Sequence, residues 1–361
     1  MFGWMGEQPR KHKKSWLWQK NTLPKIGHEC FEVASERSRA LEILPNIHRV
    51  GTPMGERVVY QYLFVGEKVL LFDTGLDSSF ETVILPYLRN IGVNPDRLQF
   101  ALVSHADGDH LGGNQALKRL APQVLLMAHN LDIPMIENVE RLIEERYNQF
   151  YPDHGLGISP EAIDWVRQNC KPYVSVDIGL EGGETFRLQP GWELKILHVP
   201  GHTYGHLCLY DAAHRLAAIG DAVLGEGVPD AEGQRITLPP TYLYVDSYLS
   251  SIKALLNLPI DVLLTGHYPI MRGKQVTEFL YGSLFFTQRL EEGILQTIRE
   301  AHSALTLKEI ILALSEKIGN WPAEACVGDA TFPFSGHLQR LENFGQIRQD
   351  RKGNYIAWKA A

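Results

Sequence analysis

The sequence lacks several features that would point to particular classes of protein. It has no apolar run of the roughly 20 residues that a membrane-spanning helix needs. Its first residues contain no apolar stretch followed by small residues, so we expect no secretory signal. The net charge of -7 provides no overall positive field for binding nucleic acid. We therefore expect neither a membrane nor a nucleic-acid partner.

Cysteine is also scarce. The four cysteines stand far apart and form no Cys-x-x-Cys pair; they are Cys30, Cys170, Cys208 and Cys326. Isolated thiols in a long chain indicate a reducing compartment rather than a disulfide framework. We therefore expect a cytoplasmic protein.

The composition is that of an ordinary soluble globular protein, with 361 residues, 44% hydrophobic and 21% charged. We find no internal repeat and no low-complexity tract. The pattern predicts three regions: an irregular N-terminal segment (1–40), a catalytic domain (41–272) and a helical C-terminal domain (273–361).

Strand-like and helix-like segments alternate within residues 41–272, and strands then dominate its second half. This order favours a layered α/β sandwich over a doubly wound parallel sheet. The stretch at about 130–170 has helical spacing and predicts a helical insertion. Beyond residue 273, three helical segments precede two short strands, which is the plan of a winged helix.

Four polar clusters stand where a predicted strand meets a loop. In chain order they contain His105, Asp107, Asp109 and His110; then His198, His202 and His206; then Asp221; then His267. Two carboxylates this close together repel each other unless a cation lies between them. Imidazole and carboxylate groups bind divalent metals, so the clusters predict a metal site. We interpret His198, His206 and Asp73 as structural residues that bond to neighbouring groups.

The order of these clusters resembles the metallo-β-lactamase superfamily, which contains hydrolases and some redox enzymes. The resemblance covers about residues 45–270 and rests on five segments: FDTG (72–75), SHADGDHLGG (104–113), PGHTYGH (200–206), GD (220–221) and TGH (265–267). It implies an α/β fold, a four-layer αβ/βα sandwich with a helical insertion and a small C-terminal winged-helix-like domain. It also implies a metallo-β-lactamase-fold metallohydrolase.

Carried over position by position, the resemblance implies a dinuclear site. His105, Asp107 and His202 would hold the first metal, Asp109, His110 and His267 the second, and Asp221 would bridge them. Asp109 and Asp221 would also take part in catalysis. The cofactors would be two divalent ions, zinc first, with iron or manganese as alternatives. A metal-bound hydroxide would then cleave an ester, lactone, thioester or related bond of a small-molecule substrate.

Asp107 departs from the family motif, His-x-His-x-Asp-His, which has a histidine at this position. A carboxylate makes the first site harder and more negative, which favours iron or manganese more than an all-histidine site does. If Asp107 does not bind a metal, one ion remains at the second site.

Two other functions stay open. The flavodiiron branch of the superfamily also has a carboxylate at this position, so the alternative is a di-iron redox enzyme that lacks its flavodoxin module. A non-catalytic protein that binds a partner through its C-terminal winged-helix-like domain is the other alternative. The mixed charge of that region argues against a phosphate-binding face.

The substrate is the least defined prediction. The insertion is aromatic and is interpreted either as a lid over the pocket or as a packed helical pair. Three tyrosines between the last two clusters, Tyr242, Tyr244 and Tyr248, fit core positions better than substrate contacts. Because no cationic cluster accompanies the predicted ligands, we favour an uncharged ester, lactone or thioester. A homodimer is left open.

Overall fold

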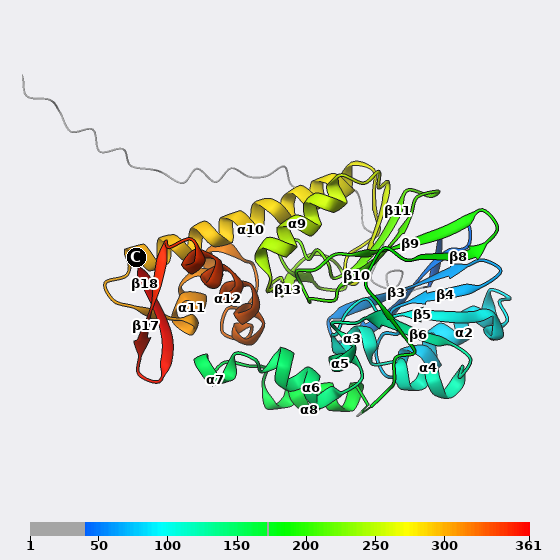
Figure 1. Ribbon diagram of the computed structural model, residues 1–361, viewed down its shortest axis with the longest axis horizontal. Helices are drawn as coiled ribbons and strands as arrows, with labels where there is room; N and C mark the ends of the chain where they lie inside the picture. Colours follow the sequence, from blue (N-terminus) through cyan, green and yellow to red (C-terminus); the bar gives the residue numbers. More distant parts are fainter. Residues whose placement is uncertain (1–39, 172) are drawn as a thin grey trace, which may run out of the picture. The chain divides into compact units, whose positions relative to one another are not determined.

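The computed structural model describes residues 40–171 and 173–361; the predicted irregular segment 1–40 lies outside this range except for Ala40. One sheet has seven strands in the order β1-β2-β3-β4-β5-β6-β7 (Figure 1). Its strands are β1 (Leu41–Leu44), β2 (Ile47–Met54), β3 (Arg57–Val65), β4 (Val69–Phe72), β5 (Leu98–Leu102), β6 (Leu125–His129) and β7 (Ile178–Leu180).

A second sheet has six strands in the order β15-β14-β11-β10-β9-β8. They are β8 (Thr185–Gln189), β9 (Trp192–His198), β10 (Leu207–Asp211), β11 (Leu216–Gly220), β14 (Val262–Thr265) and β15 (Met271–Arg272). A separate two-stranded ribbon joins β12 (Val228–Pro229) and β13 (Ile236–Leu238). Both large sheets mix parallel and antiparallel pairs. In the first sheet β4-β5 is parallel and β3-β4 antiparallel, and in the second sheet β11-β14 is parallel and β10-β11 antiparallel.

Successive side chains of the central strands point to opposite faces of the sheet, and this alternation produces the layers of the sandwich. In β3, Tyr62 and Phe64 belong to a core that also holds Leu194 and Leu209 of the second sheet. The intervening Leu63 belongs to a different core, on the outer face of the first sheet. Since successive strand residues point to opposite faces, the first sheet is buried on both sides. The predicted αβ/βα sandwich is therefore confirmed.

Helices cover the two outer faces. The first sheet is covered by the helical turn η1 (Phe80–Ile84) with α2 (Leu85–Asn90) and α4 (Asn114–Leu120), and the short turn η2 (Pro95–Arg97) leads into β5. The second sheet packs against α9 (Val245–Leu256) and α10 (Lys274–Glu300). Tyr242 and Tyr248 are fully buried in this second outer core, as expected from the sequence.

The insertion is helical, as predicted, but it is broken into short pieces. They are α5 (Ile133–Ile136), α6 (Val139–Leu142), η3 (Ile143–Tyr147), α7 (Tyr151–His154) and α8 (Pro160–Asn169). Ser159 caps α8 by accepting a hydrogen bond from the Ala162 amide, which agrees with the Ser-Pro-Glu signal in the sequence. The insertion leaves and rejoins the first sheet between β6 and β7.

The C-terminal region contains the three predicted helices and the final hairpin. After α10 come β16 (Leu305–Thr306), α11 (Leu307–Ile318), α12 (Val327–Asn343), β17 (Ile347–Lys352) and β18 (Tyr355–Ala360). The hairpin and β16 form a three-stranded sheet in the order β16-β18-β17. Most of α12 is buried, including Phe332, Phe334 and Leu338, so little of this helix is free to enter a nucleic-acid groove.

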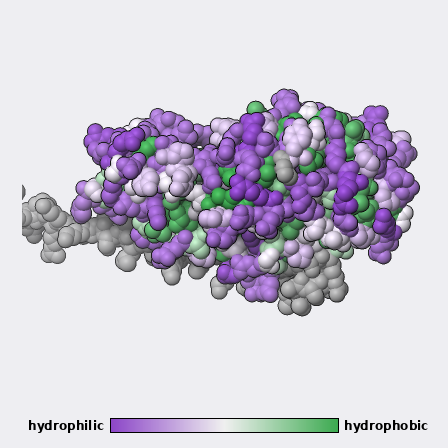
Figure 2. All heavy atoms as spheres, turned by 90° about the horizontal axis from the view of Figure 1, so that it is seen from below, coloured by the Kyte–Doolittle hydropathy of each residue, from purple (hydrophilic) through white to green (hydrophobic). Residues whose placement is uncertain are grey.

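The described residues contain no helix suited to span a membrane and show no large apolar patch on the face in view. None of the described helices is both long and apolar enough to cross a bilayer. On the face in Figure 2, hydrophilic residues predominate and the hydrophobic ones form small, separate patches. The exposed large apolar side chains are spread over several elements, with Tyr151 in α7 and both Tyr281 and Phe285 in α10.

Candidate metal centre

Four loops carry all seven predicted ligands to one edge of the sandwich. These loops follow β5 in the first sheet and β9, β11 and β14 in the second. They supply, in that order, His105, Asp107, Asp109 and His110; His202; Asp221; and His267. The structure therefore brings together residues that lie more than 150 positions apart in the sequence.

One group of donor atoms, here called the second subsite, consists of Asp109, His110, Asp221 and His267. His267 Nε2 lies 3.3 Å from Asp109 Oδ2 and 3.2 Å from Asp221 Oδ2. His110 Nε2 lies 3.8 Å and 3.6 Å from the same two oxygens. Ligands about 2.0–2.2 Å from a tetrahedral ion stand roughly 3.3–3.6 Å apart, so this spacing suits a divalent metal.

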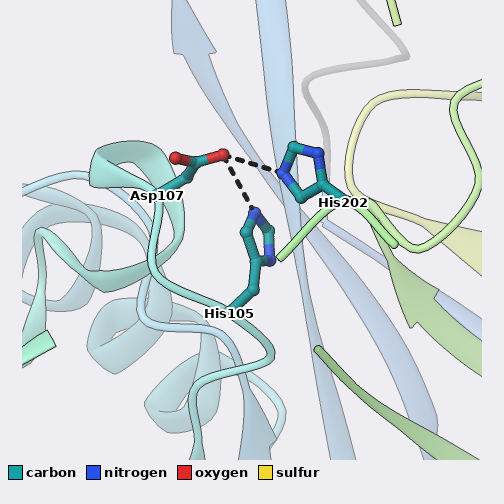
Figure 3. Close-up of side chains that lie close together, drawn as sticks. All are labelled: His105, Asp107 and His202. Carbon is teal, nitrogen blue, oxygen red and sulfur yellow. Dashed lines mark hydrogen bonds and ion pairs between the residues drawn. The ribbon is translucent and has the colours of Figure 1, made fainter. Parts of the chain in front are cut away.

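A second group, here called the first subsite, consists of His105, Asp107 and His202 (Figure 3). Both imidazoles point at one carboxylate oxygen: Asp107 Oδ2 is 3.4 Å from His105 Nε2 and 2.8 Å from His202 Nε2. His105 Nε2 has no hydrogen-bond partner among the described residues. It also groups with donor atoms of His110 and Asp221, all within 4.8 Å of one another, so His105 lies between the two subsites.

Each of the four histidines is oriented through its Nδ1 atom. The Nδ1 partners are Ser104 Oγ for His105 (2.8 Å), Asp73 Oδ2 for His110 (2.8 Å), Thr241 O for His202 (3.0 Å) and Val58 O for His267 (3.0 Å). A carbonyl oxygen can only accept, so Nδ1 of the last two histidines carries the proton. In the neutral ring, Nε2 of each then carries the lone pair and points toward the centre, the arrangement that metal binding requires.

Asp73 connects two of these histidines. Its Oδ1 accepts from the Ser104 amide at 2.7 Å, and its Oδ2 accepts from Ser104 Oγ at 2.9 Å and contacts His110 Nδ1 at 2.8 Å. Because the Ser104 hydroxyl donates to Asp73, it is free to accept from His105 Nδ1. Asp73 also has a positive φ of 64°, which only a few side chains tolerate. It is thus a structural strand-end carboxylate, as expected.

Asp132 has a comparable role that the sequence did not indicate. This buried carboxylate accepts from the Ala106 amide (3.1 Å), Thr203 Oγ1 (2.7 Å) and the Gly205 amide (2.8 Å). Ala106 stands in the loop of His105, whereas Thr203 and Gly205 stand in the loop of His202. Asp132 therefore fixes the two ligand loops relative to each other.

Arg146, in η3 of the insertion, is the other residue that sequence reasoning missed. Its Nε and Nη2 donate to Asp107 Oδ1 and Oδ2 at 2.6 and 2.8 Å. Its Nη1 donates to His202 O at 3.2 Å, and Nη2 lies 3.2 Å from His202 Nε2. Nothing in the local sequence distinguishes Arg146 from the solvent-exposed Arg141, which pairs with Glu145.

Charges distinguish the two subsites. Burial alone would raise the pKa of Asp109, but the charge of His110 and contact with His267 lower it to about 2. Burial would lower the pKa of His267, but the charge of Asp221 and contact with Asp109 raise it to about 9. In the first subsite, burial and then the charge of Arg146 lower the pKa of His202 to about 4. The second subsite also has two carboxylates, whereas the first has one that is already paired with Arg146.

The remaining histidines of the second cluster behave as structural residues. His206 Nε2 accepts from the Asp221 amide at 3.2 Å, and its ring stacks on His105. His198 Nε2 donates to Tyr204 O at 2.7 Å, and its ring stacks on His129. Neither histidine belongs to a described group of possible metal ligands.

The centre opens into a cavity of about 850 Å³. Asp107, Asp109, Asp221 and His267 lie at its floor, and the insertion and the C-terminal region form much of its wall. The wall includes Tyr147, Leu156, Ile158 and Trp165 from the insertion and Lys308, Leu312, Val327, Asp329 and Phe332 from the C-terminal region. Tyr147 Oη also accepts from the Gly108 amide at 3.0 Å, which ties the insertion to the ligand loop.

The residues of the second subsite fit a metal ion. His110 Nε2 and Asp221 Oδ1 are buried and have no hydrogen-bond partner among the described residues, which is costly unless something else binds them. Gly266 leaves the space open, because a Cβ there would clash with Asp221 Oδ1. The first subsite fits less well, because the Arg146 guanidinium already binds both oxygens of its carboxylate.

A sandwich of two mixed sheets covered by helices, with histidines and carboxylates gathered at one edge, defines a metallo-β-lactamase-fold hydrolase. The model of the metallo-beta-lactamase superfamily matches residues 54–267. The chain therefore belongs to this superfamily.

Two curated relatives are hydrolases by name. Acyl-coenzyme A thioesterase MBLAC2 of Gallus gallus is 28% identical over 208 residues, which cover 54% of this chain and 68% of the relative. Hydroxyacylglutathione hydrolase of Nitrosococcus oceani is 28% identical over 125 residues, which cover 34% of this chain and 33% of the relative.

A solved structure shares the fold over most of the chain. The metallo-beta-lactamase family protein TTHA1429 from Thermus thermophilus superposes with a TM-score of 0.67 at 19% identity. The match covers 89% of this chain and 100% of that chain. Because residues 1–272 make up less than 89% of the 361 residues, the match must include part of the C-terminal region.

Proposed function

We propose that this protein is a metal-dependent hydrolase that cleaves an ester, lactone or thioester of a small molecule. The observation that carries the proposal is the second subsite, in which Asp109, His110, Asp221 and His267 stand at ligand spacing and all but His110 line the cavity. These four residues would hold a divalent ion. When bound, such an ion lowers the pKa of a coordinated water and polarises the bond to be cleaved.

The chain's own groups would position that chemistry. Asp73 fixes the tautomer and ring of His110, and the Val58 carbonyl does the same for His267. We assign Asp109 and Asp221 as the catalytic carboxylates, since both are ligands and both line the cavity. Tyr147 and the Arg146–Asp107 pair would form the adjoining floor against which the substrate lies.

Zinc is the first choice for the metal, with iron or manganese as alternatives. Two imidazoles and two carboxylates would suit zinc, whereas the larger share of oxygen donors would suit the harder ions. The assignment of His105, Asp107 and His202 to a first metal, and hence a count of two ions, stays a prediction.

Among the possible bonds we favour a thioester. The cavity wall carries apolar side chains such as Leu156, Ile158 and Phe332, which suit an acyl chain. The two curated relatives described above carry the names of a thioesterase and of a hydroxyacylglutathione hydrolase. Arg57 and Lys308, also in the wall, would face a polar or anionic group at the other end of the substrate.

The alternatives receive less support from the geometry. The carboxylate that suggested a di-iron redox enzyme, Asp107, is paired with Arg146. The binding-protein alternative needs a free surface on the C-terminal region, but its helix α12 is mostly buried and helps to line the cavity.

We also propose that the protein acts in the cytoplasm. In support, Cys170, Cys208 and Cys326 are all buried free thiols, as expected of a protein from a reducing compartment. The assembly state stays a prediction, with a homodimer as one option that size-exclusion chromatography with light scattering would decide.

The proposal is tested by measuring metal content together with hydrolysis of acyl thioesters, carboxylic esters, lactones and phosphodiesters. We expect bound divalent metal, thioester hydrolysis, and loss of activity after chelation that added metal restores. Asp221→Ala should lose the second-subsite ion and more than roughly 100-fold of activity, because losing even a residue that orients a ligand costs about 10–100-fold. The surface variant Asp261→Ala is the control.

Two results would contradict this function. One is a folded, metal-free protein whose hydrolysis survives chelation. The other is an iron-loaded protein that consumes oxygen with a chemical reductant and hydrolyses none of the substrates.

A further inference from the structure

The first subsite holds a cation that belongs to the chain. We propose that the guanidinium of Arg146 replaces the first metal ion, so that the protein holds a single divalent ion at the second subsite. This inference rests on the proposed function, because it concerns how that metal centre is built.

The hydrogen bonds of Arg146 engage two of the three donors of the first subsite. Both oxygens of Asp107 accept from the guanidinium, at 2.6 Å from Nε and 2.8 Å from Nη2. His202 donates through Nδ1 to Thr241 O, so a neutral ring carries its lone pair on Nε2. This atom lies 2.8 Å from Asp107 Oδ2 and 3.2 Å from Arg146 Nη2, which also donates to that oxygen, so the guanidinium supplies the positive charge beside the two acceptors. The same guanidinium donates through Nη1 to His202 O. Only His105 Nε2 is left without a hydrogen bond.

Arg146 is also held firmly in this position. Its side chain is only 5% exposed, and its guanidinium carbon lies 5.2 Å from the centre of the Phe332 ring. Arginine stays protonated at every working pH. A metal ion that took Asp107 away would leave a buried guanidinium without its counter-charge, which is strongly destabilising.

Asp107 itself supports the replacement. A carboxylate matches the planar fork of a guanidinium with two parallel hydrogen bonds, whereas an imidazole offers one acceptor at most. The aspartate at the position where the family motif has histidine is therefore the residue that an arginine requires. The pairing of a carboxylate with a guanidinium therefore explains both the departure from the motif at Asp107 and the burial of Arg146 beside it.

The second subsite has no cation of this permanent kind. Among the described residues, Asp109 and Asp221 form ion pairs with histidines alone, and an imidazole, unlike a guanidinium, can lose its proton when a metal ion binds. With both imidazoles neutral, its two carboxylates need a positive charge, whereas the one carboxylate of the first subsite is already neutralised. The geometry thus points to one ion and to one fixed guanidinium beside it.

The test is to count ions per chain. Wild-type protein is loaded with excess zinc and desalted, and zinc is measured by mass spectrometry against protein concentration. We expect about one zinc per chain. Arg146→Met, which keeps most of the side-chain length but removes the charge, should approach two. Arg141→Met, which removes an exposed arginine just upstream, should stay at one.

Two results would overturn the inference: about two zinc ions in the wild type, or about one in a folded Arg146→Met protein. Circular dichroism establishes whether that variant folds. If it does not, calorimetric titration of metal-free wild type with zinc decides, because one site per chain supports the inference and two sites overturn it. A wild type that binds none of zinc, iron and manganese would instead overturn the proposed function.

Discussion

Asp73 acts on the metal centre at the scale of a single residue, although it is not one of the proposed ligands. Its carboxylate binds His110 Nδ1 and both the amide and the hydroxyl of Ser104, which in turn holds His105. One carboxylate thus orients a donor in each subsite. Its backbone lies in the left-handed region, a conformation that aspartate and asparagine adopt more readily than most residues.

Asp73→Asn tests this role without changing the backbone preference. Asparagine has a single oxygen, so its NH₂ group must face either His110 Nδ1 or the Ser104 amide, both of which donate, and the negative charge that supports the basicity of the imidazole is lost. We expect metal affinity to fall about 10–100-fold, as measured by competition with a coloured chelator. The matched control is Asp211→Asn, because Asp211 is a buried carboxylate that also binds a histidine, His214, outside the metal centre. Equal affinities in Asp73→Asn and wild type would refute the role.

At the scale of elements, α12 decides the shape of the cavity. This helix contributes Val327, Asp329 and Phe332 to the wall, although it belongs to the C-terminal region. It reaches that position because it packs very closely on the segment before α9. A Cβ at Gly336, inside α12, would clash with the backbone oxygen of Leu243.

Two glycine-to-alanine variants measure that close contact. Gly336→Ala should lower the free energy of unfolding by about 1–3 kcal/mol, because the added methyl group overpacks a rigid backbone contact. Gly282→Ala, inside α10 with no atom within 4 Å of the added Cβ, should be neutral or stabilising by up to about 1 kcal/mol. Urea denaturation of both proteins provides the comparison. Similar values for the two variants would show that α12 does not pack this closely.

At the scale of the whole molecule, the core of the second outer layer extends across the predicted domain boundary at residue 272. Tyr248 and Ile252 of α9 share it with Phe286 and Leu290 of α10 and with Leu338 of α12. The described residues all belong to one compact unit. The division into 41–272 and 273–361 stays a prediction about folding.

Expressing residues 41–272 alone tests that division. Removing the C-terminal region would expose the apolar face of α9 and part of the cavity wall, so we expect an aggregated or loosely packed protein. Near-ultraviolet circular dichroism and size-exclusion chromatography measure both properties, with the full chain as the control. A fragment that unfolds cooperatively and binds zinc would show that the C-terminal region is a separable domain.

Most of the layered fold could be read from the sequence because its signals are local. Strands β3 and β4 show apolar runs joined by a Gly-Glu-Lys turn, and Ser159 and Pro160 begin α8 as their residue types predict. The insertion was harder to predict, because its helical spacing continues across Asn138 while the structure starts a new helix there, capped by that side chain.

The sequence by itself determined that His105, Asp109 and His110 stand together, because they lie in a single loop at a strand end, and the resemblance added the predicted ligands of the other three clusters. Only the tertiary structure decided what surrounds them. Arg146 reaches Asp107 across 39 positions, and Asp132 reaches Thr203 across 71. Such contacts depend on how separate loops pack in three dimensions, and no periodicity or spacing along the chain encodes them.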